Sequence, residues 1–367
     1  MNLLVTVRND SAGQPCRLKV ARSWIRSHNA KAPGDSPGSV QTHDGGTVKA
    51  LQGVEGHVEW VEEPDPALDV GQVRIKVAAA GLNRADLLQR AGLYPPPPGV
   101  TSIIGLECSG VIDEVGPGTS WQVGDRVCAL LAGGAMAEQV VVDARHVLPV
   151  PDGLSLHEAA AIPEVYATAW LNLFQLAGLK PGEKVLLHAG ASGVGSAGIQ
   201  LCKAFGSPVW VSVGSTERLA YCVELGAQGG VVRSDSLESL SDFAPFDVIL
   251  DPVGANYSGL NVKLLGLDGR WVLIGLMGGR EAQLDLAQVL GKRIQVLGST
   301  LRSRDDQFKA DLLSDLGQHV WPLFTEGRLK PQLARTFPIK DAEAAFAELA
   351  TNQVSGKIVL VIDESLK

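Results

Sequence analysis

The chain has 367 residues, of which 45% are hydrophobic and 20% charged, a composition typical of a globular protein with about two domains. Its net charge of −8 argues against a general nucleic-acid-binding protein, because such proteins usually carry a basic excess. No apolar run reaches the roughly 20 residues of a membrane-spanning helix, so no membrane segment is predicted.

The five cysteines are scattered along the sequence, and no CxxC pair occurs. This spacing predicts neither a disulfide framework nor a thiolate zinc cluster, and it fits a reducing, cytoplasmic location.

Residues 1–46 differ from the rest of the chain, because they are rich in Ser, Gly, Pro and Arg and lack sustained apolar periodicity. Three interpretations stay open for this segment. It is a disordered extension, an organellar transit peptide, or the product of a misassigned start, in which case the natural chain begins at Val48.

Residues 48–168 have the pattern of a β-rich domain. Segments 58–61 and 73–77 alternate apolar and polar residues, as half-buried strands do. Further strands are expected at 105–115, 125–131 and 137–143, separated by Gly and Pro turns. Short strands with such turns predict a compact, partly open barrel.

From residue 169 to about 304 the pattern changes to strands that alternate with helices. Near-continuous apolar strands in this alternation predict a doubly wound parallel sheet with both faces covered. Residues 305–350 are expected to be helical, and 357–362 to form a late strand that returns to the first domain. The expected strands are 184–188, 209–213, 230–232, 248–251, 270–274 and 293–297, and the expected helices are 196–205 and 217–225.

A glycine-rich turn follows the strand at 184–188. Gly193-Val-Gly195-Ser-Ala-Gly198 matches GxGxxG at a strand-to-helix junction. Glycines there let the backbone approach a pyrophosphate, and the first amides of the helix point at it. The turn therefore predicts a dinucleotide-binding site, with a merely tight structural turn as the alternative.

The next strand ends in Gly214-Ser215-Thr-Glu217-Arg218, without the acid that usually holds the ribose of NAD. Ser215 can donate to a phosphate and Arg218 can pair with its charge, and Arg233 is a further candidate for the same pocket. These residues favour NADPH. Glu217 argues against this interpretation, and an ordinary solvated charge is the alternative for Arg218.

Several segments together resemble the medium-chain dehydrogenase/reductase superfamily from about residue 48 to 363. Within it, the chain is similar to the zinc-free quinone oxidoreductases related to zeta-crystallin, and most similar to their tumour-suppressor-inducible branch. The segments are Leu82-Asn-Arg-Ala-Asp-Leu, Gly92-Leu-Tyr-Pro-Pro-Pro-Pro-Gly, Gly105-Leu-Glu-Cys-Ser-Gly, Ala161-Ile-Pro-Glu, His188-Ala-Gly-Ala-Ser-Gly-Val-Gly, Leu267-Asp-Gly-Arg-Trp-Val-Leu-Ile-Gly-Leu-Met-Gly-Gly and Leu301-Arg-Ser-Arg-Asp.

The resemblance implies a GroES-like catalytic domain at 48–168 with 305–367, and a Rossmann NADPH-binding domain at 169–304. It also implies a homodimer paired through edge strands of the nucleotide domain. In the family's register, Gly198 lies inside the helix as a packing residue. The cofactor contacts that follow from this register are Gly190, Ser192, Gly193, Val194, Gly195, Thr168, Gly275, Leu276, Met277 and Lys357.

Zinc-dependent relatives place a Cys where Asn83 stands and a His where Leu106 stands, with the third ligand near Glu164. Glu107 and Glu164 alone cannot supply the three ligands of a catalytic zinc, so no metal is expected. Alcohol dehydrogenation, which uses zinc to polarise the oxygen, becomes the less favoured reaction.

The predicted catalytic residues are Asn83, Tyr94 and Tyr166. The Asn83 amide could donate to the acceptor oxygen, although it could also cap the following helix. Tyr94 stands before four prolines, on a loop stiffened by their fixed φ angles, and could stack on a quinone or donate its hydroxyl. Packing is the alternative for Tyr94. Tyr166 is expected to line the pocket, at a position where the branch that the chain resembles most carries another aromatic residue. His188 and Asp251 are interpreted as buried structural residues.

Three functions remain open. The first is NADPH-dependent, zinc-independent reduction of a small-molecule quinone, by hydride or electron transfer. The second is reduction of an enone, 2-alkenal or enoyl thioester by the same cofactor. The third is a non-catalytic NADPH-binding protein. The sequence does not specify the physiological acceptor, one- against two-electron transfer, or the oligomeric state.

Overall fold

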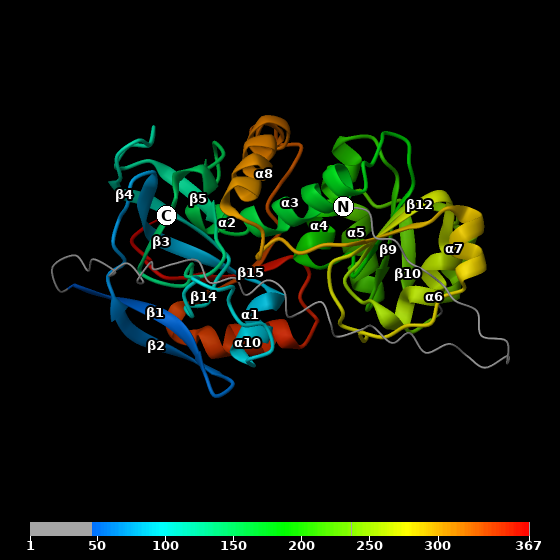
Figure 1. The fold of residues 1–367 in the computed structure, drawn as a ribbon, viewed down its shortest axis with the longest axis horizontal. Coiled ribbons are helices and arrows are strands. Elements are labelled where there is room, and N and C mark those ends of the chain that lie inside the picture. The colour runs from blue at the N-terminus through cyan, green and yellow to red at the C-terminus, as the bar shows by residue number, and fades with distance from the viewer. Residues whose placement is uncertain (1–45, 236, 367) are drawn as a thin grey trace, which may run out of the picture. The chain divides into compact units, whose positions relative to one another are not determined.

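The computed structural model describes residues 46–235 and 237–366. The interpretations of residues 1–45 lie outside this part of the chain. The described residues contain a seven-stranded mixed sheet, a six-stranded parallel sheet and a separate two-stranded hairpin. Figure 1 shows the two larger sheets with helices α3 (Pro163–Trp170) and α8 (Asp306–His319) between them.

The seven-stranded sheet is open, because its order β14-β15-β3-β4-β5-β7 has two free ends and β6 pairs only with β3. This agrees with the predicted GroES-like, partly open barrel. Its core is built from alternate residues of the long strand β3, among them Val73, Ile75 and Val77. The strands are β3 (Gln72–Leu82), β4 (Glu107–Val115), β5 (Arg126–Leu130), β6 (Gln139–Asp143), β7 (Val147–Pro149), β14 (Leu333–Pro338) and β15 (Lys357–Val361).

Shorter elements surround this sheet. The hairpin of β1 (Thr47–Val54) and β2 (His57–Pro64) is antiparallel. Helices α1 (Arg84–Arg90), α2 (Leu156–Ala159), α9 (Trp321–Thr325) and α10 (Ala342–Ala350) complete this half, and a π-helical turn, Leu171–Leu176, continues α3.

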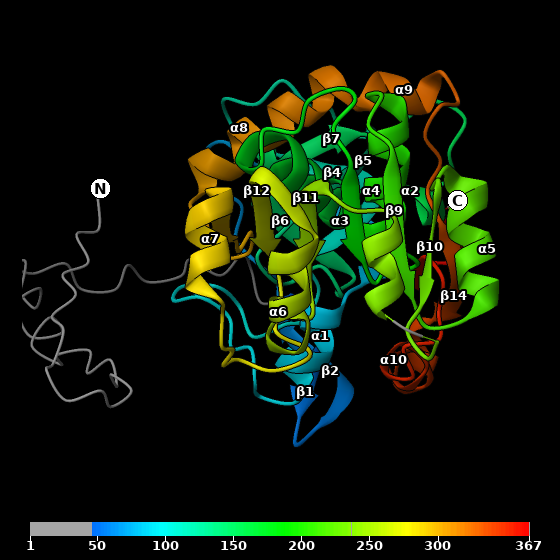
Figure 2. The same ribbon diagram turned by 90° about the vertical axis from the view of Figure 1, so that its right-hand side faces the viewer.

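The six-stranded sheet has the order β10-β9-β8-β11-β12-β13, and every pair in it is parallel. In chain order this is 3-2-1-4-5-6, the arrangement of a Rossmann fold, as predicted. Figure 2 shows strands of this sheet with helices α5 (Thr216–Leu225), α6 (Ala255–Leu264) and α7 (Leu286–Lys292) around them. The strands are β8 (Val185–His188), β9 (Val209–Val213), β10 (Gly229–Val232), β11 (Phe246–Asp251), β12 (Leu265–Leu273) and β13 (Gln295–Gly298).

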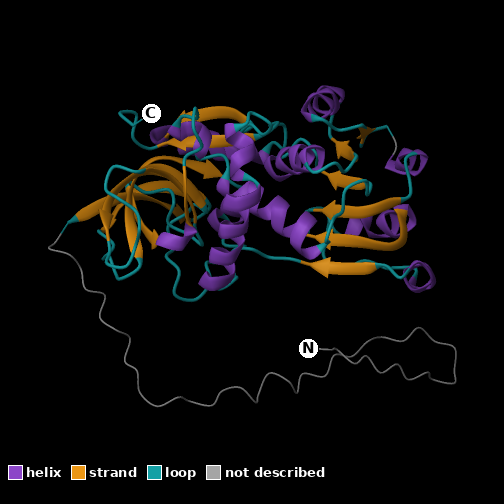
Figure 3. Ribbon diagram, turned by 90° about the horizontal axis from the view of Figure 1, so that it is seen from above, coloured by secondary structure: helices purple, strands orange, loops and turns teal. Residues whose placement is uncertain are grey.

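Both faces of this sheet are buried. Val185 and Leu187 of β8 pack in one apolar cluster with residues of α4 (Gly193–Ala204) and α5 (Thr216–Leu225). Leu186, between them in sequence, packs in a second cluster with residues of α6 (Ala255–Leu264) and with Val289 of α7 (Leu286–Lys292). Successive residues of a strand point to opposite faces, which explains why β8 is apolar throughout. Figure 3 shows the same strands and helices from above.

Three local expectations differ from the structure. Residues 305–350 are not continuously helical, because β14 interrupts them and pairs in parallel with β15. Helix α4 begins at Gly193 rather than at 196, because Ser192 caps it there. The sequence pattern also missed β1, β7, α2, α6 and α7.

Among the described residues, no helix combines the length and the apolar character that a transmembrane span requires.

Candidate active site and cofactor site

The glycine-rich turn joins β8 to α4 and leaves no room for a side chain at Gly190 or Gly195. A Cβ on Gly195 would lie 2.4 Å from the Gly190 carbonyl oxygen, and one on Gly190 would lie 2.5 Å from Val211 Cγ1. Ser192 caps α4 by accepting from the Gly195 amide at 3.1 Å. The amides of Gly193 and Val194 then begin the helix without a partner inside it, so they can donate to a bound anion.

This turn lies at the point where the strand order of the parallel sheet reverses, between β8 and β11. Ligands of doubly wound sheets bind beyond the carboxyl ends of the strands at such a point. The loops after β11 and β12 lie together at the same edge, since a Cβ on Gly275 would meet Pro252 O at 2.8 Å. Leu276 and Met277 follow there and are 52% and 51% exposed. The predicted contact residues on these loops therefore share one edge of the sheet.

Two arginines approach each other at the end of β9. A Cβ on Gly214 would lie 2.7 Å from Arg218 Nη1 and 3.2 Å from Arg233 Nη2. Burial lowers the pKa of Arg218, and the like charge of Arg233 lowers it further. Ser215 caps α5 beside them. Among the described residues, neither guanidinium forms a close ion pair with a carboxylate, so two positive charges face one region. The charge of Glu217 acts on Arg218 from a distance, and Arg233 hydrogen-bonds to the Tyr257 side chain. The arrangement can hold a dianionic phosphate.

At the junction of the two sheets, Asn83, Glu107 and Lys357 form one buried network. Lys357 Nζ lies 2.6 Å from Glu107 Oε1 and donates to Asn83 Oδ1 at 2.6 Å and Leu82 O at 2.9 Å. Asn83 Nδ2 donates to Glu107 Oε1 at 2.9 Å, and Asn83 is also the N-cap residue of α1. All three donors of the ammonium therefore have acceptors within the protein.

The strand that carries Lys357 also touches the glycine turn. The Gly356 amide donates to Ala191 O at 2.9 Å, and Gly356 forms a bridge with Ser192. A Cβ on Gly193 would lie 2.7 Å from Lys357 Cδ, so the lysine stem packs against the turn. This contact places the Asn83, Glu107 and Lys357 network directly beside the predicted cofactor turn.

Two more carboxyl groups adjoin this network. Asp86 is completely buried, and its Oδ2 accepts from the backbone amide of Asn83 at 2.6 Å, while Oδ1 has no hydrogen-bond partner among the described residues. Burial raises the pKa of Asp86 to about 7. Glu164 lies in the first turn of α3, and its backbone amide donates to Glu107 Oε2 at 2.9 Å. Burial and the nearby charge of Glu107 raise the pKa of Glu164 to about 8.

Tyr94 is held by an arginine that comes from the other sheet. Arg302 follows β13, and its guanidinium carbon lies 5.0 Å from the centre of the Tyr94 ring. The same group donates to Tyr94 O at 3.3 Å, to Ala132 O at 2.6 Å and to Gln89 Oε1 at 2.7 Å. Burial raises the pKa of Tyr94. The tyrosine loop is therefore fixed from the nucleotide-domain side.

Tyr166 and Thr168 lie on α3, but Tyr166 points into the core. Its hydroxyl donates to Lys330 O at 3.2 Å and accepts from Gln200 at 3.1 Å, and its ring packs edge-on against Phe324. These contacts are those of a packing residue, and its catalytic role stays a prediction. Thr168 is partly buried on the side of the helix that carries Glu164, four residues earlier.

The predicted site did not include Glu107, Asp86 or Arg302 as functional residues. For two of them, Asp86 and Arg302, the sequence contains a local signal. Asp86 comes three residues after Asn83, the spacing of a helix capping box, and Arg302 stands in the segment Leu301-Arg-Ser-Arg-Asp. Their convergence depends on three separate elements, and the spacing along the chain contains no sign of it.

His188 and Asp251 lie at the carboxyl ends of β8 and β11 and are linked through Asn261. Asp251 Oδ2 accepts from Asn261 Nδ2 at 2.9 Å, so Asn261 Oδ1 faces His188 Nε2 at 2.8 Å. His188 Nδ1 lies 2.8 Å from the Ser212 hydroxyl. Burial lowers the pKa of His188, so the ring is neutral with its proton on Nε2. This arrangement agrees with the prediction that both residues are structural.

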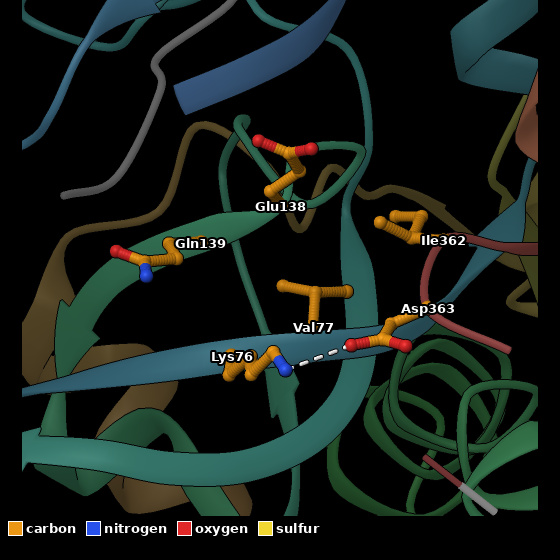
Figure 4. Close-up of a pocket in the computed structure, with 6 residues that line it drawn as sticks. All are labelled: Lys76, Val77, Glu138, Gln139, Ile362 and Asp363. Carbon is orange, nitrogen blue, oxygen red and sulfur yellow. Dashed lines mark ion pairs between the residues drawn. The ribbon is translucent and has the colours of Figure 1, made fainter. Parts of the chain in front are cut away.

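A separate polar hollow of about 240 Å³ lies at the other end of β15 (Figure 4). It is bordered by the ion pair of Lys76 with Asp363, whose charged atoms are 2.9 Å apart. Because β15 runs from Lys357 to Val361, this hollow does not adjoin the Asn83 network. Over residues 46–235 and 237–366, no group of three or more His, Cys, Asp or Glu is arranged to hold a metal ion.

Two family models match the chain. They are the alcohol dehydrogenase GroES-like domain over residues 69–152 and the zinc-binding dehydrogenase over residues 193–316. The synaptic vesicle membrane protein VAT-1 homolog of Rattus norvegicus is 30% identical over 317 residues, 81% of this chain and 78% of that protein. Polyketide synthase GfsB of Streptomyces halstedii is 33% identical over 311 residues, 84% of this chain. The chain spans only 5% of the length of that synthase.

Solved structures give the same pattern. The quinone oxidoreductase of Pseudomonas syringae pv. Tomato DC3000 superimposes with a TM-score of 0.76 at 28% identity, over 86% of this chain and 100% of that one. The CurK enoyl reductase superimposes with a TM-score of 0.75 at 28% identity, over 86% and 99% of the two chains. Both kinds of reductase therefore share this arrangement of sheets.

Proposed function

The chain belongs to the medium-chain dehydrogenase/reductase superfamily, and on this premise we propose that it is a zinc-independent NADPH:quinone oxidoreductase. The superfamily assignment makes it an oxidoreductase with an NAD(P)-binding fold. The choices of NADPH and of a quinone are the proposal. The likeness to the Pseudomonas syringae quinone oxidoreductase supports the acceptor.

The observation that carries the cofactor choice is the approach of two guanidinium groups, those of Arg218 and Arg233, to Gly214. The charge of Glu217 acts on Arg218 but is outweighed there by burial and by the like charge of Arg233, so the pKa of Arg218 stays lowered. A 2′-phosphate would neutralise two like charges that otherwise repel each other. NADH has only hydroxyls there, and the strand ends without the acid that would hold them. The Ser215 hydroxyl would add a donor.

When bound, the nicotinamide supplies a hydride, which quinones accept without a metal because the charge spreads onto oxygen. The chain's residues do the rest. The turn at Gly190, Ser192, Gly193, Val194 and Gly195 would hold the pyrophosphate. Further contacts would come from Thr168 and from Gly275, Leu276 and Met277, and Tyr94 would stack on the acceptor. In this proposal, Lys357 anchors the Asn83 and Glu107 network rather than the cofactor.

Cofactor binding tests this proposal. We expect the purified protein to bind NADPH at least tenfold more tightly than NADH, measured by fluorescence titration, and to oxidise NADPH with naphthoquinones. Arg218→Ala should weaken NADPH binding by about 10- to 100-fold, because a charge-assisted hydrogen bond contributes about 1.5–3 kcal/mol. Its affinity for NADH should not change.

The matched control is Arg328→Ala, since that arginine is half exposed and lies beyond α9. It should leave both affinities as they are. A wild-type preference for NADH above tenfold would contradict the phosphate argument.

A second candidate function is reduction of an enone, 2-alkenal or enoyl thioester by the same cofactor. The likeness to the CurK enoyl reductase and to part of a polyketide synthase supports it. Steady-state rates with phenanthrenequinone and with 2-alkenals, at one NADPH concentration, discriminate the two. Turnover of alkenals alone would remove the quinone proposal and leave this one.

We also propose a homodimer in the cytoplasm. The strand β13 is an edge of the parallel sheet, and Val296 on it is 43% exposed, which supports pairing there. The four described cysteines are free and buried, which fits a reducing compartment.

A further inference from the structure

Reduction of a quinone or enone consumes a proton, and the side-chain amide of Asn83 is not an acid that can release one. It is not free to donate a hydrogen bond to the acceptor either. Its Nδ2 donates to Glu107 Oε1 at 2.9 Å and to Gly81 O at 3.3 Å, and its Oδ1 accepts from Lys357 at 2.6 Å. A primary amide has two N–H donors, and both already have acceptors. The acceptor's proton therefore has to come from another group nearby.

Three acids lie together in this network, and among the described residues only Glu107 forms an ion pair, with Lys357. Two further cations face Glu164, but the Lys309 ammonium pairs with Asp306 and the Arg302 guanidinium donates to carbonyl and amide oxygens. Adjacent carboxylates that lack an ion-pair partner disfavour each other's ionised form in a buried site. The site therefore retains at least one proton near neutral pH.

Of the two carboxyls without an ion-pair partner, only Glu164 can reach a small molecule. Asp86 is 0% exposed and is enclosed beneath α1. Glu164 is only partly buried, and in the described part of the chain its carboxyl oxygens form no hydrogen bond. The next residue, Val165, meets the cofactor turn, since a Cβ on Gly193 would lie 2.9 Å from Val165 Cγ1.

We propose that Glu164 is the acid that delivers a proton to the acceptor as it is reduced, an inference that rests on the proposed function. Glu107 positions it, because one carboxylate accepts from both the Glu164 amide and the Asn83 side chain. The start of α3 is thereby fixed beside the cofactor turn, with Tyr94 near enough for its pKa to respond to the charge of Glu164.

Burial maintains the protonated form of Glu164. The start of a helix favours an ionised carboxylate, but here burial and the charge of Glu107 outweigh that effect and raise the pKa to about 8. Lys357 and Arg302 act in the opposite direction. The titratable and charged groups that face Glu164 are Glu107 of β4, Asp86 of α1, Lys357 of β15, Lys309 of α8, and Arg302 and Tyr94 on loops.

The step balances as a two-electron reduction. With an enone, the β-carbon gains a hydride, the carbonyl becomes an enolate, and the Glu164 O–H bond breaks as its proton moves to that enolate. With a quinone, hydride and proton together give the hydroquinone. NADPH is oxidised to NADP⁺, and the Glu164 carboxylate recovers a proton from water, to which it is partly exposed. The products are therefore a hydroquinone or a saturated carbonyl, not a semiquinone.

One test needs no cofactor. Infrared spectra of the free protein, recorded across a pH titration, should contain a protonated-carboxyl C=O band that disappears with a midpoint near the Glu164 pKa of about 8. Glu164→Gln should lack that band and keep the earlier one from Asp86, whose pKa is about 7. If the variant retains the later band, the proposal is overturned.

The kinetic test uses the same variant. Glu164→Gln keeps the shape and removes the acid, so kcat should fall by about 100-fold or more, the usual contribution of general acid catalysis. In the wild type, kcat should decline as pH rises through about 8, because the acid loses its proton. That decline should be absent in Glu164→Gln and retained in Glu164→Asp, while NADPH affinity stays unchanged.

The matched control is Glu224→Gln, the same change at an exposed position on α5, which should alter neither kcat nor the pH profile. A Glu164→Gln enzyme with wild-type kcat and an intact alkaline decline would overturn the proposal. If Glu164→Gln does not fold, Glu164→Asp and the wild-type infrared titration decide. Failure of the proposed function is distinct, because the wild type itself would then not oxidise NADPH with any acceptor.

Discussion

Lys357 is a buried cation whose side chain is only 4% exposed, and the removal of its charge from water is costly. Three acceptors offset that cost, namely Glu107 Oε1, Asn83 Oδ1 and Leu82 O. The lysine thus ties the end of β3, the start of α1 and β4 to β15. Lys357 was predicted to be a cofactor contact, and this stays a prediction. Its observed polar contacts are those to Glu107, Asn83 and Leu82.

Loss of this charge should destabilise the fold. Lys357→Met leaves Glu107 buried without its cation, and we expect the free energy of unfolding to fall by about 3–5 kcal/mol. The double variant Glu107→Gln with Lys357→Met should recover part of that loss, because no isolated charge remains. Urea unfolding at neutral pH measures both.

Lys340→Met, at an exposed position before α10, is the control for the loss of a lysine and should change stability by less than about 0.5 kcal/mol. Equal destabilisation by the two lysine variants would show that the ion pair of Lys357 with Glu107 does not contribute to the free energy of unfolding.

At the scale of elements, the glycines between β8 and α4 differ in how much room they leave for a side chain. Gly195 leaves none, whereas Gly198 leaves enough for a small one. The Cβ that Gly195 lacks would meet the backbone oxygens of Gly190 and Ala189 at 2.4 and 2.6 Å. At Gly198 the nearest atom is Leu187 Cδ1, the end of a flexible side chain, at 3.0 Å. An added Cβ at Gly195 would have to displace backbone, which would open the turn. At Gly198 it would displace only the end of the Leu187 side chain, which can shift.

These distances predict opposite outcomes for two matched substitutions. Gly195→Ala should open the turn and reduce NADPH affinity by more than tenfold, with a lower melting temperature. Gly198→Ala should keep NADPH affinity, and its stability should change by about 1 kcal/mol or less, because the helical preference of Ala offsets the small shift of Leu187. Fluorescence titration and thermal melting measure both.

If the literal GxGxxG match were the correct register, Gly198 would be as important for NADPH binding as Gly193 and Gly195. If Gly198→Ala lost NADPH binding as strongly as Gly195→Ala, the register that places Gly198 inside α4 would be wrong.

At the scale of the whole molecule, a polar network and one strand join the two sheets. Gln200 of α4 contacts both the amide and the carbonyl of Lys330, at 2.9 and 3.1 Å, and the Tyr166 hydroxyl shares that carbonyl. Gly356 bonds to the glycine turn just before β15 enters the other sheet. The glycine turn and the buried acids are therefore linked through residues 356 and 357.

The outer edge of the parallel sheet provides the last prediction. Leu286 and Leu290 of α7 are 72% and 80% exposed, and Val296 on the edge strand β13 is 43% exposed. A dimer paired through β13 would cover this apolar surface, which is unusual on a monomer. Sedimentation velocity should find a dimer for the wild type and a monomer for the double variant Leu290→Lys with Val296→Lys.

Val70→Lys, at a position 77% exposed beside β3 of the other sheet, is the control and should remain a dimer. A monomeric wild type would contradict the proposed dimer. A double variant that remains a dimer would show that the dimer contact does not lie at β13.

Local physics explains what the sequence alone determined. Alternating and continuous apolar runs predicted most strands, because burial on one face or on both leaves that mark. The glycine turn, the strand end without an acid and the Arg218 position were likewise visible, since each acts through its own neighbours in the chain. The two-domain fold class and the cofactor edge of the parallel sheet followed from these signals.

Only the tertiary structure decided which distant residues meet. The strand β14 forms because β15 lies beside it, and its six residues have no pattern of their own strong enough to show it. Asp86, Glu107, Glu164 and Lys357 come from four elements up to 271 residues apart. The raised pKa values of Asp86 and Glu164, and the ion pair of Glu107 with Lys357, depend on their meeting in a buried site. Desolvation and charge coupling depend on distance in space, which is why spacing along the chain did not reveal the buried acids.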